Sequence, residues 1–565
     1  MGLLDLPTEL AVQIFGLLDV NDLISSRLIC RSTNAIYNGS SLLQYLFSLR
    51  VAGFIDHGGH MNVRHKLHLL RTQEERWRNL DLSNKVTVET QHTPSNIYDL
   101  SGGVYVLGDS ERDIIRRRTL SLRYLDLHEA SLKSGLVTEA WPQLSFGAKI
   151  IDIGLALEEH DLVAVISRKK RGSSSRIDLL LRNFSTGKNH ASAAQPDIFV
   201  NEYHGMQSPR FSIMIEIVGT YLLLLVTIPS HISSMDTLFL YNWMTGGLHY
   251  REEAPPGTWS GFVFLSPECV VIPNMTTNTL DIYHIDSAGD FEWIRRLALP
   301  YLVTNATILH VACRADPNPW GRDSKGYQNR HGHGRAQPPF GSDPENAVVL
   351  FKLHTRRFIE AMATPFTFIV HRSALLRFAC MRNLAYPDEP DLEDEGVIVE
   401  WEDWGPANTR WGGLEEERSR WITCTAGQRQ VLLKGNKIVV RDYNPFEVRR
   451  VLATHGTAGS PGGVEYDEIQ AVEGSLTIRN GQRTVTVVTG PSICEGGVVL
   501  ENNVESSLPY VEITAEDEVD YEGMLVNDER LIGLCVNPQF EQTFTTVERL
   551  DIFSLSSFGL DIVST

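Results

Sequence analysis

The residue types that most often carry catalysis or bind metals are scattered along this sequence and form no recognised motif. No H-E-x-x-H pair, G-x-S-x-G elbow, G-x-x-x-x-G-K-S/T loop or G-x-G-x-x-G fingerprint occurs. Residues 456–463 are Gly-rich but lack the nucleophile spacing, and His331 and His333 have no neighbouring ligands. The seven cysteines include no C-x-x-C pair, which argues against a zinc ribbon or a redox motif. We therefore expect no catalytic residue, no metal site and no cofactor.

Charged clusters are more prominent than catalytic motifs. Residues 168–171 (RKKR) read as a hairpin tip, and residues 116–118 (RRR) lie in a polar region. Residues 387–403 and 512–529 are acidic. Solvated loops are the favoured interpretation of all four clusters. For the basic ones, phosphate-binding arginines and a nuclear-localisation patch are the alternatives.

Composition and charge restrict the partners. The chain has 565 residues, of which 42% are hydrophobic, and a net charge of −19. This charge makes nucleic acids and anionic membranes improbable partners. The richest apolar run, residues 213–228, has 16 residues, fewer than the roughly 20 that cross a bilayer. Because no secretory leader is apparent either, we expect a soluble protein of the cytoplasm and/or nucleus.

The first 50 residues have a helical period. Leu6, Leu10, Ile14, Leu17 and Leu18 recur at helical spacing, and Asp22 is placed to begin a second helix. Residues 41–44 (SLLQ) have the form of a capping box opening a third helix. Three short helices bury little apolar surface by themselves, which suggests a partner surface.

This segment resembles the F-box motif. The pattern L-P-x-E-L at 6–10, I-F at 14–15, Leu18, D-L at 22–23 and L-I-C-R at 28–31 matches that motif in order and spacing. The tryptophan that many F-boxes place after Cys-Arg is replaced by residues 32–34 (STN). The resemblance implies docking on a Skp-type adaptor and, through it, on a cullin–RING ubiquitin ligase. The residues expected to bind the adaptor or pack the helices are Leu6, Pro7, Leu10, Ile14, Phe15, Leu18, Leu23, Leu28, Cys30 and Arg31.

Residues 62–80 predict an amphipathic connector helix. Val63, Leu67, Leu70 and Trp77 fall on one face, and residues 73–76 and Arg78 are expected on the opposite, polar face. The apolar face should pack on the following domain and fix its orientation. The chain also resembles a large group of fungal F-box proteins with a propeller-like region. The resemblance lies in the order of Leu, Glu and Trp in this helix and in the sequences of residues 98–103, 241–246 and 264–274.

From residue 85 onward, short aliphatic runs separated by Gly, Pro, Asn and Ser predict strands. Residues 161–187 align without gaps on residues 220–246, and both segments run from a strand through an aromatic residue to a Thr-Gly turn. Residues 280–286 and 438–443 look like degenerate copies. Repeated strand units of about 60 residues indicate a β-propeller of six to eight blades. A pair of β-sandwiches is the alternative.

The expected architecture is therefore multidomain, with an all-α F-box at 1–50, a connector at 51–80 and a large all-β domain at 81–565. Residues 316–345, with five Pro and five Gly, read as an insertion. The resemblance implies a non-catalytic substrate receptor of a Skp–cullin–F-box ligase that binds an unidentified protein substrate through its β domain. Two alternatives remain open at this point: an adaptor-bound scaffold without ubiquitin transfer, and a propeller hydrolase with a helical appendage.

Overall fold

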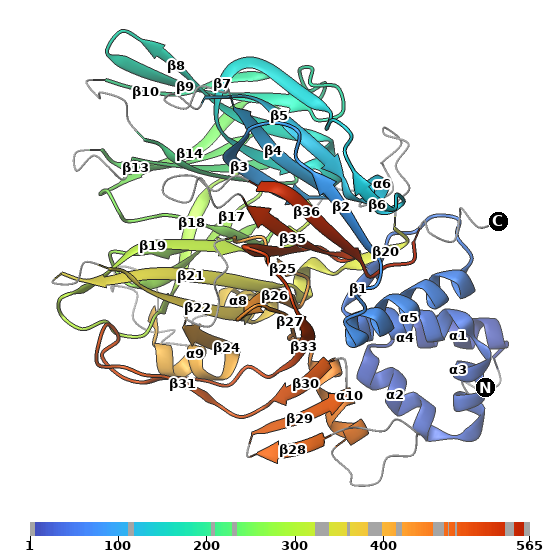
Figure 1. Ribbon diagram of the computed structural model, residues 1–565. Coiled ribbons are helices and arrows are strands. Elements are labelled where there is room, and N and C mark those ends of the chain that lie inside the picture. Colours follow the sequence, from blue (N-terminus) through green and yellow to red (C-terminus); the bar gives the residue numbers. More distant parts are fainter. Residues whose placement is uncertain are drawn as a thin grey trace.

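Helices dominate the chain up to residue 79 and strands dominate from residue 85 onward, as the change of hydrophobic period predicts. In the computed structural model, the helices that precede residue 80 lie to one side of a much larger body of β-sheets (Figure 1). The structure describes residues 6–110, 118–204, 210–228, 234–321, 338–358, 362–381, 398–413, 421–455, 468–472, 474–480, 483–536 and 547–558. Among these, no helix combines the length and apolarity that crossing a membrane would need.

Residues 6–52, the described part of this segment, form four helices, where the sequence predicted three. Their bounds are α1 Thr8–Gly16, α2 Val20–Ile29, α3 Arg31–Gly39 and α4 Ser41–Ala52. Helix α3 buries only Thr33 and Tyr37, so no apolar row marks it in the sequence. A capping box between Cys30 and Thr33 opens this helix. Helix α4 is capped by Ser40, whose Oγ accepts a backbone N–H at 3.2 Å, and not by Ser41.

The β region consists of four-stranded sheets that follow one another along the chain, each running outward from its first strand. Blade 1 contains β3 Pro94–Ser101, β4 Val104–Ser110, β5 Thr119–Asp126 and the start of β7 Gln143–Ala156. Blade 2 contains the rest of β7, β8 Leu162–Arg171, β9 Ser174–Asn183 and β10 Asp197–Tyr203. Blade 3 contains β11 Ser212–Val218, β12 Tyr221–Thr227, β13 Asp236–Asn242 and β14 Gly247–Ala254.

The remaining blades repeat this order. Blade 4 contains β15 Val263–Ser266, β16 Cys269–Asn274, β17 Thr279–Ile285 and β18 Phe291–Ala298. Blade 5 contains β19 Ala306–Arg314, β21 Val348–Arg357, β22 Thr364–His371 and β24 Thr409–Gly413. Blade 6 contains β25 Thr425–Ala426, β26 Arg429–Lys434, β27 Lys437–Asp442 and β33 Tyr510–Glu518. Blade 7 contains β34 Gly523–Val526, β35 Arg530–Val536, β36 Val547–Ser554 and β2 Lys85–Glu89.

Blade 7 joins the two ends of the β region. Strand β2 pairs antiparallel with β36, so that Val86 lies opposite Ile552 and Val88 opposite Leu550; Figure 1 shows these strands side by side. An early strand that completes the last sheet closes the ring and leaves no open end. The described residues thus form a seven-bladed propeller, within the predicted range of six to eight, and not a pair of sandwiches.

The repeat found in the sequence corresponds to equivalent strands. Residues 161–187 cover β8 and β9, and residues 220–246 cover β12 and β13, the second and third strands of blades 2 and 3. Both Thr-Gly turns end in a glycine with positive φ, 67° at Gly187 and 78° at Gly246, a conformation that favours glycine. The degenerate copies at 280–286 and 438–443 fall on third strands as well, β17 and β27.

The apolar run at 213–228 is explained by its place between blades. In β12, Leu222, Leu224 and Val226 pack against blade 2. The alternate residues Leu223 and Leu225 pack against blade 4. Side chains of a strand alternate between the two faces of its sheet. A strand covered on both faces is therefore continuously apolar.

Further elements decorate the propeller. They are β1 Phe54–Asp56, paired with β20 Phe340–Ser342; α6 Leu127–Ser131, β6 Gly135–Val137, α7 Leu157–His160, η3 Pro344–Asn346, α8 Arg372–Cys380, β23 Ile398–Val399, α9 Trp401–Asn408, α10 Pro445–His455, β28 Glu468–Val472, β29 Ser475–Asn480, β30 Arg483–Val488, and the paired β31 Ser492–Cys494 and β32 Val504–Ser506.

Two of the expected acidic loops differ from the prediction. Residues 512–529 include most of β33 and all of β34, and Glu512 accepts ion pairs from Lys434 at 2.7 Å and Arg441 at 2.9 Å. Residues 398–403 of the other stretch begin β23 and α9. Three further segments lie outside the described residues: the rest of that acidic stretch, residues 116–117 of the basic RRR run, and most of the 316–345 insertion with His331 and His333. The basic run 168–171 does end β8 at a hairpin, as expected.

Helix α5 (Val63–Asn79) joins the helices to the propeller. Trp77 is buried in the core shared by blades 5, 6 and 7, and Arg429 lies over its ring at 4.9 Å. Gln73 and Glu74, expected on the polar face, are buried. Arg429 Nη2 donates to both carboxylate oxygens of Glu74, at 2.9 and 2.8 Å, and Arg429 Nε donates to Asp442 at 3.1 Å. The polar side of α5 is therefore also an interface.

Candidate functional site

The helical module exposes more apolar side chain than its size explains. On α1, Leu10, Ile14 and the C-cap residue Leu17 follow one another at intervals of four and three, and all are exposed. Leu17 is 86% exposed, and on α2 the exposed fractions of Leu28 and Ile29 are 81% and 75%. With the exposed Ile24, these residues make up what we call the apolar helix surface: Leu10, Ile14, Leu17, Ile24, Leu28 and Ile29. Such a set of aliphatic side chains is typical of a protein-binding surface.

The other predicted apolar residues form the core of the module. Phe15 and Leu23 are buried together with Tyr37 and Leu43. Leu18 packs against this core and is partly buried. Helical geometry separates the two groups, because Leu10, Ile14 and Leu17 share a face that Phe15 does not. The structure therefore divides a residue set that the sequence left undivided.

The remaining predicted residues lie at helix ends. Pro7 is the exposed N-cap of α1, and its carbonyl accepts the N–H of Leu10 at 3.0 Å. Leu6 before it is partly buried. Cys30 joins α2 to α3, and its carbonyl accepts the Thr33 hydroxyl at 2.8 Å. Arg31 follows as the exposed first residue of α3.

The sequence reasoning missed three residues of the apolar helix surface. Leu17, Ile24 and Ile29 were not among the predicted binding residues, although two of them are more exposed than Leu10 or Ile14. The signal was present for Leu17, which continues the spacing of Leu10 and Ile14. In Figure 1, α1 and α3 lie on the side of α4 away from the propeller. This side of the module is open to a partner.

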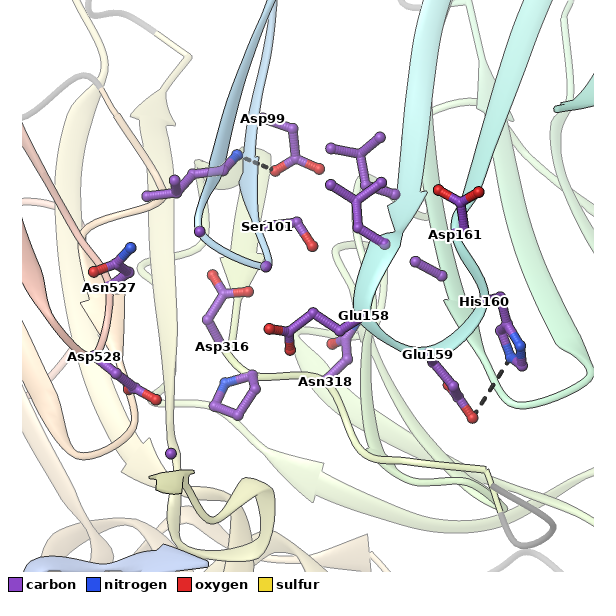
Figure 2. Close-up of a pocket in the computed structure, with 18 of the residues that line it drawn as sticks. Asp99, Ser101, Glu158, Glu159, His160, Asp161, Asp316, Asn318, Asn527 and Asp528 are labelled. Carbon is purple, nitrogen blue, oxygen red and sulfur yellow. Dashed lines mark hydrogen bonds and ion pairs between the residues drawn. The ribbon is translucent and has the colours of Figure 1, made fainter. Parts of the chain in front are cut away.

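A second candidate site is a pocket of about 910 Å³ at the centre of the propeller. Residues from the innermost strands of six of the seven blades line it, β15 of blade 4 being the exception. The carboxyl groups of Glu158, Asp316 and Asp528 come from three different blades into this space (Figure 2). Pockets of this size enclose small-molecule or peptide-like ligands.

Helix α7 and the turn after it present the acids of blade 2. Asp161 has a φ of 55°, and its carboxylate accepts the Ser185 N–H at 3.0 Å and the Ser185 hydroxyl at 2.6 Å. Glu159 accepts the N–H groups of Gly219 at 3.1 Å and Gly321 at 2.9 Å. These bonds hold the carboxylates at fixed positions on the pocket wall.

One arginine balances part of the charge in the pocket. Arg314 donates to Asp99 at 2.9 Å and to Asp316 at 2.8 Å. Burial nevertheless raises the pKa of Asp99. Burial also raises the pKa of Glu216 to about 7, with Arg314, Asp316 and Arg372 as its charged neighbours. Burial, more than any neighbouring charge, therefore raises the pKa of these two carboxyl groups.

Asp528 connects the pocket to the connector helix. Its carboxylate accepts the Ser342 N–H at 2.7 Å and the Ser342 hydroxyl at 2.5 Å. Its carbonyl oxygen accepts Gln73 Nε2 at 3.0 Å and Trp77 Nε1 at 3.2 Å from α5. His57, just after β1, also lines the pocket. The helical module and α5 therefore border the same side of the propeller as the pocket.

Comparisons with known proteins bear mainly on the helical module. A family model described as F-box-like matches residues 3–48. No curated protein sequence matches the chain.

Three solved structures illustrate the structural similarities. BamB from Moraxella catarrhalis is 7% identical over 83% of this chain and 98% of that chain, with a TM-score of 0.30. Apo AztD from Citrobacter koseri is 11% identical over 76% and 90%, with a TM-score of 0.27. Kuenenia stuttgartiensis hydrazine synthase is 12% identical over 52% of this chain and 66% of that chain, with a TM-score of 0.28. The propeller architecture itself follows from the strand pairing described above.

Proposed function

We propose that the protein is the substrate-receptor subunit of a Skp–cullin–F-box E3 ubiquitin ligase. In this proposal, the apolar helix surface binds a Skp-type adaptor and the propeller binds a protein substrate. The observation that carries it is the exposure of Leu17, Leu28 and Ile29 on a module that matches an F-box-like family.

The geometry of the apolar helix surface supports a helix-in-groove interface. Exposed aliphatic side chains at intervals of three and four residues insert into an apolar groove of a partner. Phe15 and Leu23 fill the core of the module, so they keep α1 and α2 in place without reaching the partner. The polar end of the surface is Arg31, which we assign to the rim of the adaptor interface.

The packing of α5 supports a receptor of fixed geometry. A receptor of this kind performs no chemistry and accelerates transfer by holding the substrate near the charged enzyme. The orientation of the substrate depends on a rigid connection between the adaptor-binding module and the propeller. The Arg429–Glu74 ion pair and the bonds of Gln73 and Trp77 to Asp528 provide that connection.

The experiment that tests the ligase assignment is a stepwise reconstitution. The full chain is mixed with a Skp-type adaptor and then with a cullin–RING pair, and each complex is isolated by affinity purification on the chain. We expect the adaptor to be retained directly and the cullin to be retained only when the adaptor is present. Retention of the adaptor without the cullin would contradict the ligase assignment and favour a scaffold that works without ubiquitin transfer.

A pair of variants tests whether retention of the adaptor and the cullin depends on the apolar helix surface. Leu17→Asp places a charge on the apolar helix surface and should abolish retention of both partners. Leu136→Asp, at an exposed leucine of β6 in the propeller, is the matched control and should retain both. Equal retention by the two variants would contradict the docking surface.

A further inference from the structure

The β8–β9 hairpin carries a basic run that is followed by three serines. Residues 168–176 (RKKRGSSSR) contain five cationic side chains and no acidic one. Residues 169–171 extend past the last residue pair that joins β8 to β7, Arg168 with Lys149. In the described part of the chain, this end of β8 pairs only with β9, and its other edge is open. Figure 1 shows the two strands on the side of the propeller away from the helical module.

The three serines differ in accessibility. Ser175 is 2% exposed and accepts two hydrogen bonds from Arg168, at 3.2 and 2.9 Å. Ser174 is buried as well, and its hydroxyl donates to the Arg171 carbonyl at 3.0 Å. Ser173 is exposed, and among the residues that the structure describes none forms a hydrogen bond with its hydroxyl. Ser173 therefore carries the hydroxyl that an enzyme can reach.

A two-residue turn holds Ser173 at the tip of the hairpin. Arg171 pairs with Ser174, so that Gly172 and Ser173 are the two central residues of the turn. Gly172 has a φ of 57°, as the first central position of a type II′ hairpin turn requires. The φ of Ser173 is negative, and strand β9 begins at the next residue. The exposed hydroxyl therefore stands at the end of an extended basic strand.

Two cations close to the tip have no carboxylate partner. Lys169 and Arg176 both pair with Asp178, at 3.2 and 2.6 Å. Lys170 and Arg171 are exposed, and no carboxylate of the described residues pairs with either of them. Protein kinases recognise their substrates partly by the pattern of charge around the acceptor hydroxyl. An exposed hydroxyl that follows exposed cations suits a kinase with acidic residues beside its active site.

A second basic run shows that this pattern alone does not make an accessible acceptor. Residues 116–119 (RRRT) have the same order of basic residues and hydroxyl as the hairpin. Thr119, however, begins β5, pairs with Ile150 of β7 and is only 7% exposed. The chain therefore contains two sequences of this kind, and the fold exposes the hydroxyl of Ser173 while it buries that of Thr119.

We infer that Ser173 is a phosphorylation site for a protein kinase that selects basic residues before its acceptor. The inference goes beyond the proposed function and does not depend on it. In the reaction, Ser173 Oγ attacks the γ-phosphorus of ATP, and the new O–P bond forms as the bond to the β,γ-bridging oxygen breaks. ADP leaves, and a carboxylate of the kinase takes the hydroxyl proton.

Phosphorylation of Ser173 changes the charge of the hairpin and not its fold. A phosphoserine carries a charge of about −1.5 to −2 at pH 7, which takes residues 168–176 from +5 to about +3. Lys170 and Arg171 supply cations for the phosphate oxygens. Because no described residue bonds to the Ser173 hydroxyl, the modification breaks no hydrogen bond of the blade.

The test uses the folded full chain, Mg²⁺-ATP and the catalytic subunit of cAMP-dependent protein kinase, which prefers acceptors preceded by adjacent basic residues. Phosphopeptide mass spectrometry should find phosphate on Ser173 of the folded chain and none on Thr119. Two synthetic peptides, residues 112–124 and 166–178, should both be phosphorylated, because neither is folded. No phosphate on Ser173 of the folded chain, or as much on Thr119 as on Ser173, would overturn the inference.

Matched variants assign the reaction to the hairpin. Ser173→Ala should lose the phosphate and keep the Tm of the unmodified chain. Lys170→Ala and Arg171→Ala should each lower kcat/KM by about tenfold, because each removes a cation that pairs with the kinase. Lys188→Ala, at an exposed lysine in the loop after β9, is the matched control and should leave kcat/KM unchanged. Equal kcat/KM values in these three cation variants, or an undiminished phosphate content in Ser173→Ala, would contradict the site.

Discussion

Truncation of Leu28 should weaken adaptor binding without weakening the fold. The side chain is 81% exposed on α2, so few contacts within the chain depend on it. Complete burial of a leucine side chain stabilises by about 1.5–3 kcal/mol. An adaptor groove that covers the exposed fraction of Leu28 would gain about 1.2–2.4 kcal/mol from it. Leu28→Ala should therefore raise the Kd for the adaptor by about 8- to 60-fold.

The assay is isothermal titration of the full chain with a Skp-type adaptor, with thermal unfolding measured in parallel. The control is Leu248→Ala, at a leucine of β14 that is 49% exposed on the propeller. It should leave the Kd unchanged. The Tm of the Leu28 variant should match that of the unmodified chain. An unchanged Kd for Leu28→Ala, together with unchanged values for Leu17→Ala and Ile29→Ala, would refute the docking surface.

Three other predictions concern the interior. Phe15→Ala removes a core side chain of the helical module and should destabilise it by about 3–5 kcal/mol, seen as rapid proteolysis of the first 52 residues; resistance equal to that of the unmodified chain would contradict the core assignment. Glu74→Ala leaves buried Arg429 with one carboxylate and should lower the free energy of unfolding in urea by about 3–5 kcal/mol, whereas a change below 1 kcal/mol would contradict the connector interface. Burial raises the pKa of Glu216 to about 7, above its usual 4.5, so the free energy of unfolding of the unmodified chain should fall as pH rises through that range. Glu216→Gln does not titrate and should therefore gain up to about 3 kcal/mol of stability relative to the unmodified chain between pH 5 and 7.5. A stability difference that does not vary with pH would contradict the assignment of Glu216 as a buried carboxyl group.

The fold could be predicted from the sequence where a local pattern repeats. The alignment of residues 161–187 on 220–246 identified the second and third strands of two blades, because equivalent strands pack between neighbouring blades and therefore have similar apolar patterns. The closure of the ring could not be predicted in this way. Strand β2 pairs with β36 across more than 450 residues of chain, and no local sequence feature of either strand indicates which strand it pairs with.

The helical module was predictable in outline only. The apolar period of α1 and α2 was visible, but α3 buries only Thr33 and Tyr37 and has no apolar row. The division between core and surface also needed coordinates. Phe15 is buried and Leu28 is exposed, although both are large apolar residues of one motif.

The pocket could not be predicted because its residues are distant in sequence. Asp99, Glu216, Asp316 and Asp528 lie on four different blades, and none belongs to a local motif. The acidic residues that are clustered in the sequence, at 387–403 and 512–529, were predicted to be solvated loops. One of them, at 512–529, is largely strand, with Glu512 held between Lys434 and Arg441.

The measurement that tests the central claim most directly is size-exclusion chromatography with light scattering of the full chain mixed with a Skp-type adaptor. The account predicts a stable one-to-one complex at micromolar concentration. It also predicts that Leu28→Asp elutes as a folded, adaptor-free chain. Separate elution of the unmodified chain and the adaptor would contradict the claim that the apolar helix surface is an adaptor-binding site.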